Sequence, residues 1–159
     1  MLTELFLLLK PYGYVGIFLI TLIDSATVLF PFPIPSAIFV FSAGAILNPL
    51  SIGLFAGLGA AIGEFVGYGL GAGSRRIIKR KWKNQIDNVE KLFAKYGGFF
   101  VIFIFAATPL PDDIVGIVSG ILKYPVKKYF LAVLLGKIVL NVVLAYAGFY
   151  GIKGILGYF

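Results

Sequence analysis

The sequence contains no cysteine and no histidine, and its 7 acidic residues are outnumbered by 14 lysines and arginines. Disulfides, thiolate or imidazole metal sites, and catalysis by a Cys or His side chain are therefore excluded. Charged residues make up only 13% of the chain, whereas a soluble domain has about 25%. Carboxylates, lysines, arginines and hydroxyls are left for chemistry, and we expect no metal site, no cofactor and no enzymatic activity.

The chain is rich in apolar residues. They make up 60% of the 159 residues, and the mean hydropathy is +0.98, which together predict an all-α integral membrane protein. The basic residues cluster beside apolar segments, so the net charge of +7 predicts contact with anionic lipid headgroups and not with nucleic acid. The N-terminus lacks a basic start and a small-residue cleavage site, so we do not expect a cleaved signal peptide.

The apolar segments differ in length. Residues 50–73 and 125–150 are long enough to cross a hydrocarbon core of about 30 Å, which requires about 20 helical residues. Shorter apolar pieces on either side of PFPIP and PLP are typical of helical hairpins that enter and leave a membrane on one side. The expected hairpin breaks lie at Pro33, Pro35, Pro109 and Pro111.

An internal repeat organises these segments. A shift of 76 residues places Pro33, Pro35, Gly44 and Pro49 over Pro109, Pro111, Gly120 and Pro125. We therefore predict a single domain over residues 1–159, in which residues 12–73 and 96–151 each form a re-entrant hairpin followed by one long helix. Because each unit crosses the membrane once, the second unit is inverted relative to the first. The distribution of lysine and arginine places both termini outside.

Residues 74–95 separate the two units and are rich in positive charge. Apolar residues recur there every three or four positions, which predicts a basic amphipathic helix at the membrane surface; the alternative is a solvated charged loop. The residues expected to bind the lipid surface are Arg75, Arg76, Arg80 and Lys83.

Five ionisable residues fall inside or beside apolar segments. Each costs about 2.5–3.5 kcal/mol at membrane depth, so each needs a partner, a wet cavity or a change of protonation. Glu64 and Lys137 are expected near the middle of the two long helices. Asp24 closes the first apolar segment, and Asp112 and Asp113 lie at the second hairpin break. We take all five as candidate substrate or coupling residues.

Structural roles compete with functional ones at these positions. A helix that begins at Ile114 needs one carboxylate as its cap, most naturally Asp112. Asp113 is then left for function, facing Lys137, a cation or a proton. Glu64 either titrates in a polar cavity or only pairs with a lysine beside a stripe of small residues. That stripe could serve packing within the chain or a homodimer, and it consists of Gly59, Gly63, Gly67 and Gly71.

Several of these motifs resemble the DedA or VTT-domain family of membrane proteins. AIGEFVGYGLGAG at 61–73 is similar to its glycine, acidic and tyrosine signature, and Asp24-Ser25 lies at the place of its early acidic motif. FAKYGG, TPLPDDIVGIVSG and LLGK in the second half look like the eukaryotic vacuole membrane protein branch. The resemblance covers about residues 20–150 and implies inverted re-entrant hairpins and lipid translocation.

The chain also departs from the bacterial pattern of that family. Ala106 and Asp112 occupy the positions where bacterial members commonly place two arginines, and Ala37 replaces an acidic residue of the first hairpin. The departure weakens the expectation of a polyprenyl phosphate substrate.

Three functions compete on the sequence alone. Our first interpretation is a scramblase or flippase of phospholipid or polyprenyl-phosphate-type lipid in the cell membrane, with multiple spans and a polar groove between two hairpins. The alternative is a proton- or cation-coupled transporter of a small solute that uses the same carboxylates. In the third, a non-transporting scaffold, the basic helix would bind the partner and the buried charges would be dispensable.

Overall fold

The protein is built from helices. The computed structural model describes residues 2–27, 35–73 and 82–156, and within these ranges it contains no strand. The prediction of an all-α chain is therefore confirmed for the described part. The helices are α1 (Leu2–Ala26), α2 (Ser36–Ile46), α3 (Pro49–Gly63), α4 (Phe65–Gly73), α6 (Lys83–Tyr96), α7 (Gly98–Ala106), α8 (Asp112–Ile121) and α9 (Val126–Leu156).

Two helical segments have the length and composition to span a membrane. One is Pro49–Gly73, formed by α3 and α4, and the other is the Val126–Gly151 part of α9. Asn48 caps α3 by accepting a hydrogen bond from the Ser51 N–H at 3.0 Å, as expected of a side chain at this position. Helices α3 and α4 meet at Glu64, whose backbone stays helical with φ −60° and ψ −18°. The long helix is thus interrupted only locally.

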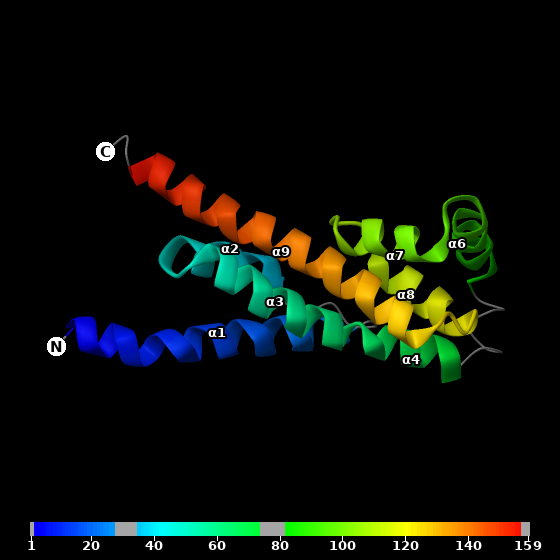
Figure 1. Ribbon diagram of the computed structural model, residues 1–159, viewed down its shortest axis with the longest axis horizontal. Helices are drawn as coiled ribbons and strands as arrows, with labels where there is room; N and C mark the ends of the chain where they lie inside the picture. The colour runs from blue at the N-terminus through cyan, green and yellow to red at the C-terminus, as the bar shows by residue number, and fades with distance from the viewer. Residues whose placement is uncertain (1, 28–34, 74–81, 157–159) are drawn as a thin grey trace.

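The two long segments run in opposite directions (Figure 1), and α3 packs against α9. Gly53 faces Val142, and one turn further Gly57 faces Ile138. The missing side chains let the helix backbones approach closely. Each end of the pair carries its own apolar core, one around Ile52 and the other around Tyr129.

The shorter helices form two hairpins on this pair. Helix α1 packs on α3 while its partner α2 packs on α9; helix α7 packs on α9 while its partner α8 packs on α4. Each hairpin therefore touches both long segments. Figure 1 shows the two hairpins pointing at each other from opposite ends, with the end of α1 and the end of α7 both near the middle of the molecule's length.

The ends of the molecule differ in kind. The start of α1 and the end of α9 both lie toward one end of the molecule, apart from each other, and α6 lies at the other end (Figure 1). Helix α6 buries Ile86 and Val89 and stops at Gly97, whose φ of 86° suits a residue without a side chain. The amphipathic helix predicted over 74–95 is thus described from Lys83 onward. Of the other predicted residues, Pro33, Arg75, Arg76 and Arg80 lie outside the described part.

The outer faces of the long segments are apolar and exposed. Leu54 on α3 and Val139 and Val143 on α9 keep 39%, 45% and 62% of their surface accessible. Isolated exposed apolar residues are ordinary in soluble proteins, but continuous apolar faces mark contact with a partner or a membrane. Such faces suit contact with lipid hydrocarbon.

Candidate functional site

The ionisable residues singled out in the sequence converge on one cavity between the hairpin tips. The cavity has a volume of about 300 Å³. The tip of the first hairpin, the midpoints of both long segments and the tip of the second hairpin all contribute to it. We call it the polar cavity, and its lining consists of Asp24, Ser25, Thr27, Pro35, Glu64, Asp112, Asp113 and Lys137.

Lys137 holds the centre of this site together. Its ammonium lies 2.9 Å from Oε1 of Glu64 and 2.5 Å from Oδ2 of Asp112. Glu64 is 2% exposed and Lys137 8%, and charges this deeply buried are tolerated only when paired. The two ion pairs join the α3–α4 junction, α8 and α9 at one point.

Two tyrosines lie beside Glu64: Tyr68, which belongs to the family signature, and Tyr129, which the sequence did not single out. The Tyr129 hydroxyl donates to the Glu64 carbonyl at 3.2 Å, and the Tyr68 N–H donates to the same oxygen at 3.3 Å. The Tyr68 hydroxyl reaches the Tyr124 carbonyl at 2.7 Å, which ties α4 to the turn before α9. The sequence does contain a signal for these contacts. A tyrosine within an apolar helix needs a hydrogen-bond partner for its hydroxyl, so its position predicts a polar contact with another helix.

The two neighbouring aspartates do not divide their roles as predicted. Helix α8 begins at Asp112 and not at Ile114, and its N-cap Pro111 makes no side-chain hydrogen bond. Asp112, expected as the cap, instead pairs with Lys137, while Asp113 lines the cavity. The contact of Asp112 with the buried ammonium is charge-assisted at both partners, whereas a contact to a backbone N–H is charge-assisted only at the carboxylate. Both carboxylates still lie in the first helical turn, where the helix dipole favours negative charge.

Asp24 has a different role at the first tip. Its Oδ2 accepts a hydrogen bond from the Ser36 N–H at 3.0 Å, across the hairpin. This N–H belongs to the first turn of α2 and has no partner within its own helix. The Asp24 carbonyl accepts from the Thr27 hydroxyl at 2.7 Å. The carboxylate therefore closes the first hairpin, and it also borders the polar cavity.

Carboxyl groups outnumber basic groups around the polar cavity. Four carboxyl groups and one ammonium line it, and oxygen atoms of Glu64, Asp112 and Asp113 lie within 4.8 Å of one another. Oxygen ligands of this kind suit protons, hard cations or ammonium groups. Lys137 pairs with two of these carboxyl groups, and Asp24 and Asp113 are the other two that line the cavity.

Comparison with known proteins identifies the family. The VTT domain matches residues 34–150, which include every residue of the polar cavity except those before Pro35. The chain belongs to the VTT-domain (DedA) family. An uncharacterised protein of Methanocaldococcus jannaschii is 30% identical over 137 residues, covering 83% of this chain and 81% of that protein. No solved structure matches the chain. This VTT-domain chain is thus a helical membrane protein of a family associated with transport.

Proposed function

We propose that the chain moves lipids between the two leaflets of the cell membrane, as a scramblase or flippase of phospholipid or polyprenyl-phosphate-type lipid. The observation that carries the proposal is the polar cavity, which is lined by both hairpin tips and surrounded by helices with apolar outer faces. A headgroup needs polar contacts to pass the hydrocarbon layer, whereas its acyl chains do not. A polar passage next to lipid-facing helices meets both needs.

The membrane arrangement that we propose is an inverted repeat of two re-entrant hairpins, with several spans and both termini outside. Contacts between helices support it. Gly44 of α2 faces Ala145 of α9, and Gly120 of α8 faces Tyr68 of α4. The two glycines are 76 residues apart and their partners 77. The same offsets recur in the contacts of Gly148 with Phe41 and of Gly71 with Ile117.

In the proposed mechanism Lys137 exchanges partners. It binds Glu64 and Asp112 at rest and turns to the phosphate of a headgroup that enters the polar cavity. The surplus carboxylates then bind an amine of the headgroup or a proton, so the cavity stays close to neutral. No bond of the lipid is formed or broken, and the lipid leaves unchanged.

The test is lipid equilibration in liposomes. Purified protein is reconstituted with fluorescent phospholipid in both leaflets, and a membrane-impermeant quencher then reports how much label reaches the outside. We expect nearly all of the label to become accessible with wild-type protein. A decrease in movement is expected for Glu64→Gln, and no change for Lys128→Met, which alters an exposed lysine. Labels that stay half protected in wild-type liposomes, both for phospholipid and for a fluorescent polyprenyl phosphate tested in the same way, would overturn the proposal.

A proton- or cation-coupled transporter of a small solute is the second candidate. The observations that favour it are the cavity volume of about 300 Å³ and the excess of carboxylates. Small-molecule sites begin at about this size, and coupling sites use buried carboxylates. Proton flux that depends on an added solute, in liposomes whose fluorescent lipids stay in place, would support this candidate against lipid transport.

The glycine stripe is occupied within the chain. Gly59 and Gly63 face the carbonyls of Phe18 and Leu22 on α1, and Gly71 faces Ile117 on α8. A homodimer remains a proposal, and it would have to use other residues.

A further inference from the structure

A second depression lies outside the polar cavity, between α6 and α7. It is an open groove of about 210 Å³, and the residues that line it are all apolar or aromatic. We call it the α6–α7 groove, and its lining consists of Leu92, Tyr96, Phe100, Val101, Ile104 and Phe105.

Helix α6 borders the groove with positive charge. Val89 and Phe93 point toward the core on one side of the Leu92–Tyr96 row. On the other side, by helical spacing, lie Lys91 and Lys95, and the Lys95 ammonium stands 4.9 Å from the centre of the Tyr96 ring. Both lysines are exposed. The groove therefore has an apolar floor and a cationic rim.

Helix α7 gives the groove its direction. Its 9 residues correspond to about 13 Å of helix, less than half of the hydrocarbon thickness of about 30 Å. Phe100 and Ile104 line the groove, whereas Ile102 and Ala106 border a small space beside Glu64 on another face of α7. In the membrane arrangement proposed above, the groove runs within one leaflet, from the charged end of the molecule toward the second hairpin tip.

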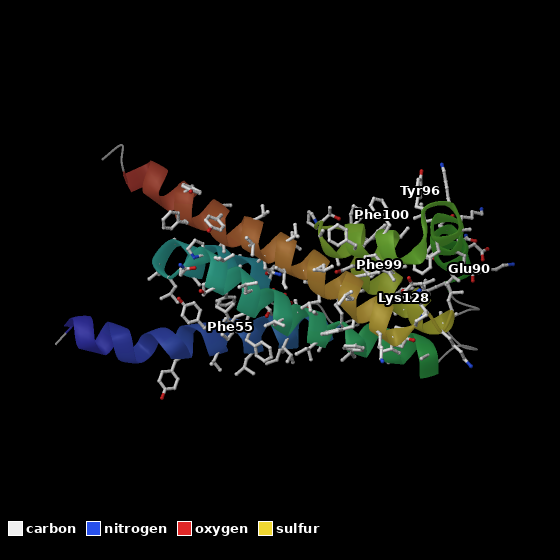
Figure 2. The ribbon with its side chains drawn as sticks, viewed as in Figure 1. Phe55, Glu90, Tyr96, Phe99, Phe100 and Lys128 are labelled. Atoms are coloured by element: carbon white, nitrogen blue, oxygen red, sulfur yellow. The ribbon has the colours of Figure 1, made fainter. Side chains whose placement is uncertain are left out.

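We propose that the α6–α7 groove binds one acyl chain of an anionic phospholipid, with the lipid phosphate held by Lys95 and Lys91. The volume is smaller than that of a site for a whole drug-sized ligand, which starts near 300 Å³, so it suits part of a single chain. The charge at the rim selects the headgroup. Figure 2 shows Tyr96 and Phe100 on the same edge of the molecule, at the end that carries α6.

Lipid binding in the groove can be followed by tryptophan fluorescence, because the chain has one tryptophan. Trp82 is the only tryptophan, so Trp82→Phe with Phe100→Trp places a single reporter in the groove. Its quenching is measured in liposomes that contain acyl-brominated phosphatidylglycerol or phosphatidylcholine at equal fractions. A matched reporter at Val143→Trp, exposed on α9, senses lipid away from any lysine rim.

We expect the groove reporter to prefer the anionic lipid by about fivefold per contributing lysine, and the Val143→Trp reporter to show no preference. Adding Lys95→Glu should remove most of the preference, and Lys128→Glu, at the same end of the molecule (Figure 2), should retain it. Equal quenching by both lipids at Phe100→Trp, or equal losses in Lys95→Glu and Lys128→Glu, would overturn the inference. Binding is read without any lipid crossing the membrane, so a failure here and a failure of the proposed transport are separate results.

Discussion

The two hairpin tips use their carboxylates for different purposes. At the first tip Asp24 accepts a hydrogen bond from Ser36 of the same hairpin. At the second tip Asp112 reaches Lys137 on the long helix α9. Ser36 and Ala37 stand in the first copy where the second copy carries Asp112 and Asp113. The first tip is thus closed on itself, while the second is tied to the centre of the molecule.

In the inverted repeat that we propose, the difference indicates how one asymmetric site arises. Packing contacts recur in both halves with almost the same sequence offset, so they supply the framework. Among the residues that the structure describes, the ion pair between Glu64 and Lys137 has no counterpart at the other half. Each of its two residues comes from a different long segment, and the two meet at the polar cavity. We therefore expect changes at the second tip to have larger effects than matched changes at the first.

The largest effect is expected for Lys137→Met. It leaves Glu64 and Asp112 buried without a cation, and removing one partner of a buried ion pair costs about 3–5 kcal/mol. A large fall in the unfolding temperature in detergent is the measurement. Adding Glu64→Gln and Asp112→Asn to Lys137→Met should restore most of the stability while transport stays absent. Unchanged stability of Lys137→Met would show that Lys137 does not hold the site together.

The second prediction compares the stability of two variants at the second tip, Asp112→Asn and Asp113→Asn. The first change removes one of the two carboxylates that pair with Lys137 and should destabilise the protein by about 1–3 kcal/mol. The second alters a carboxylate that lines the cavity without an ion pair to Lys137, and should stay within about 0.5 kcal/mol. The same thermal measurement ranks the two variants. The reverse order would assign the structural role to Asp113.

Gly120→Ala and Gly44→Ala probe what the two halves share. A methyl group at Gly120 would collide with the Tyr68 carbonyl, and one at Gly44 with the Ala145 carbonyl. Both should destabilise by about 1–3 kcal/mol, because helices must separate. Gly69→Ala on α4 is the control, since open space surrounds that position, and it should be neutral or slightly stabilising. A large difference between the two tested glycines would break the correspondence of the halves.

Asp24 variants should give the smallest effect. Asp24→Ala removes the acceptor for the Ser36 N–H and should cost about 1 kcal/mol, as the loss of a helix cap does. Asp24→Asn keeps an oxygen at the site and should cost less. The measurement is the free energy of unfolding, by chemical or thermal denaturation, of both Asp24 variants and of Asp112→Asn. If Asp24→Asn destabilises as much as Asp112→Asn, the two tips do not differ in the way described.

The helical class and the two long apolar segments could be predicted from the sequence, since composition and segment length mark them. The convergence of the ionisable residues could also be expected, because each was too costly to leave alone in an apolar segment. The roles of Asp112 and Asp113 could not be assigned. Neighbouring residues in a helix point about 100° apart, so the start of α8 at Asp112 decides which one faces Lys137.

The hydrogen bond between Tyr129 and Glu64 could not be predicted from the sequence either. The two residues are 65 positions apart, and their meeting depends on how α9 crosses the α3–α4 junction. No local pattern specifies that crossing. The family resemblance marked Glu64 and the tyrosine at position 68, but it did not reveal the hydrogen bond to the Glu64 carbonyl.

The central claim is that lipid headgroups pass through the polar cavity between the two tips. Because the chain has no cysteine, Ser25→Cys and Asp113→Cys place one thiol on each tip in an otherwise unreactive protein. A reducible bifunctional thiol reagent is then applied to the double variant in liposomes that contain fluorescent phospholipid. We predict that cross-linking of the double variant stops lipid equilibration and that reduction restores it to the rate of the unreacted double variant, while each single variant treated with the reagent keeps more lipid movement than the cross-linked protein. Lipid movement that continues at the same rate in the fully cross-linked protein would contradict the account.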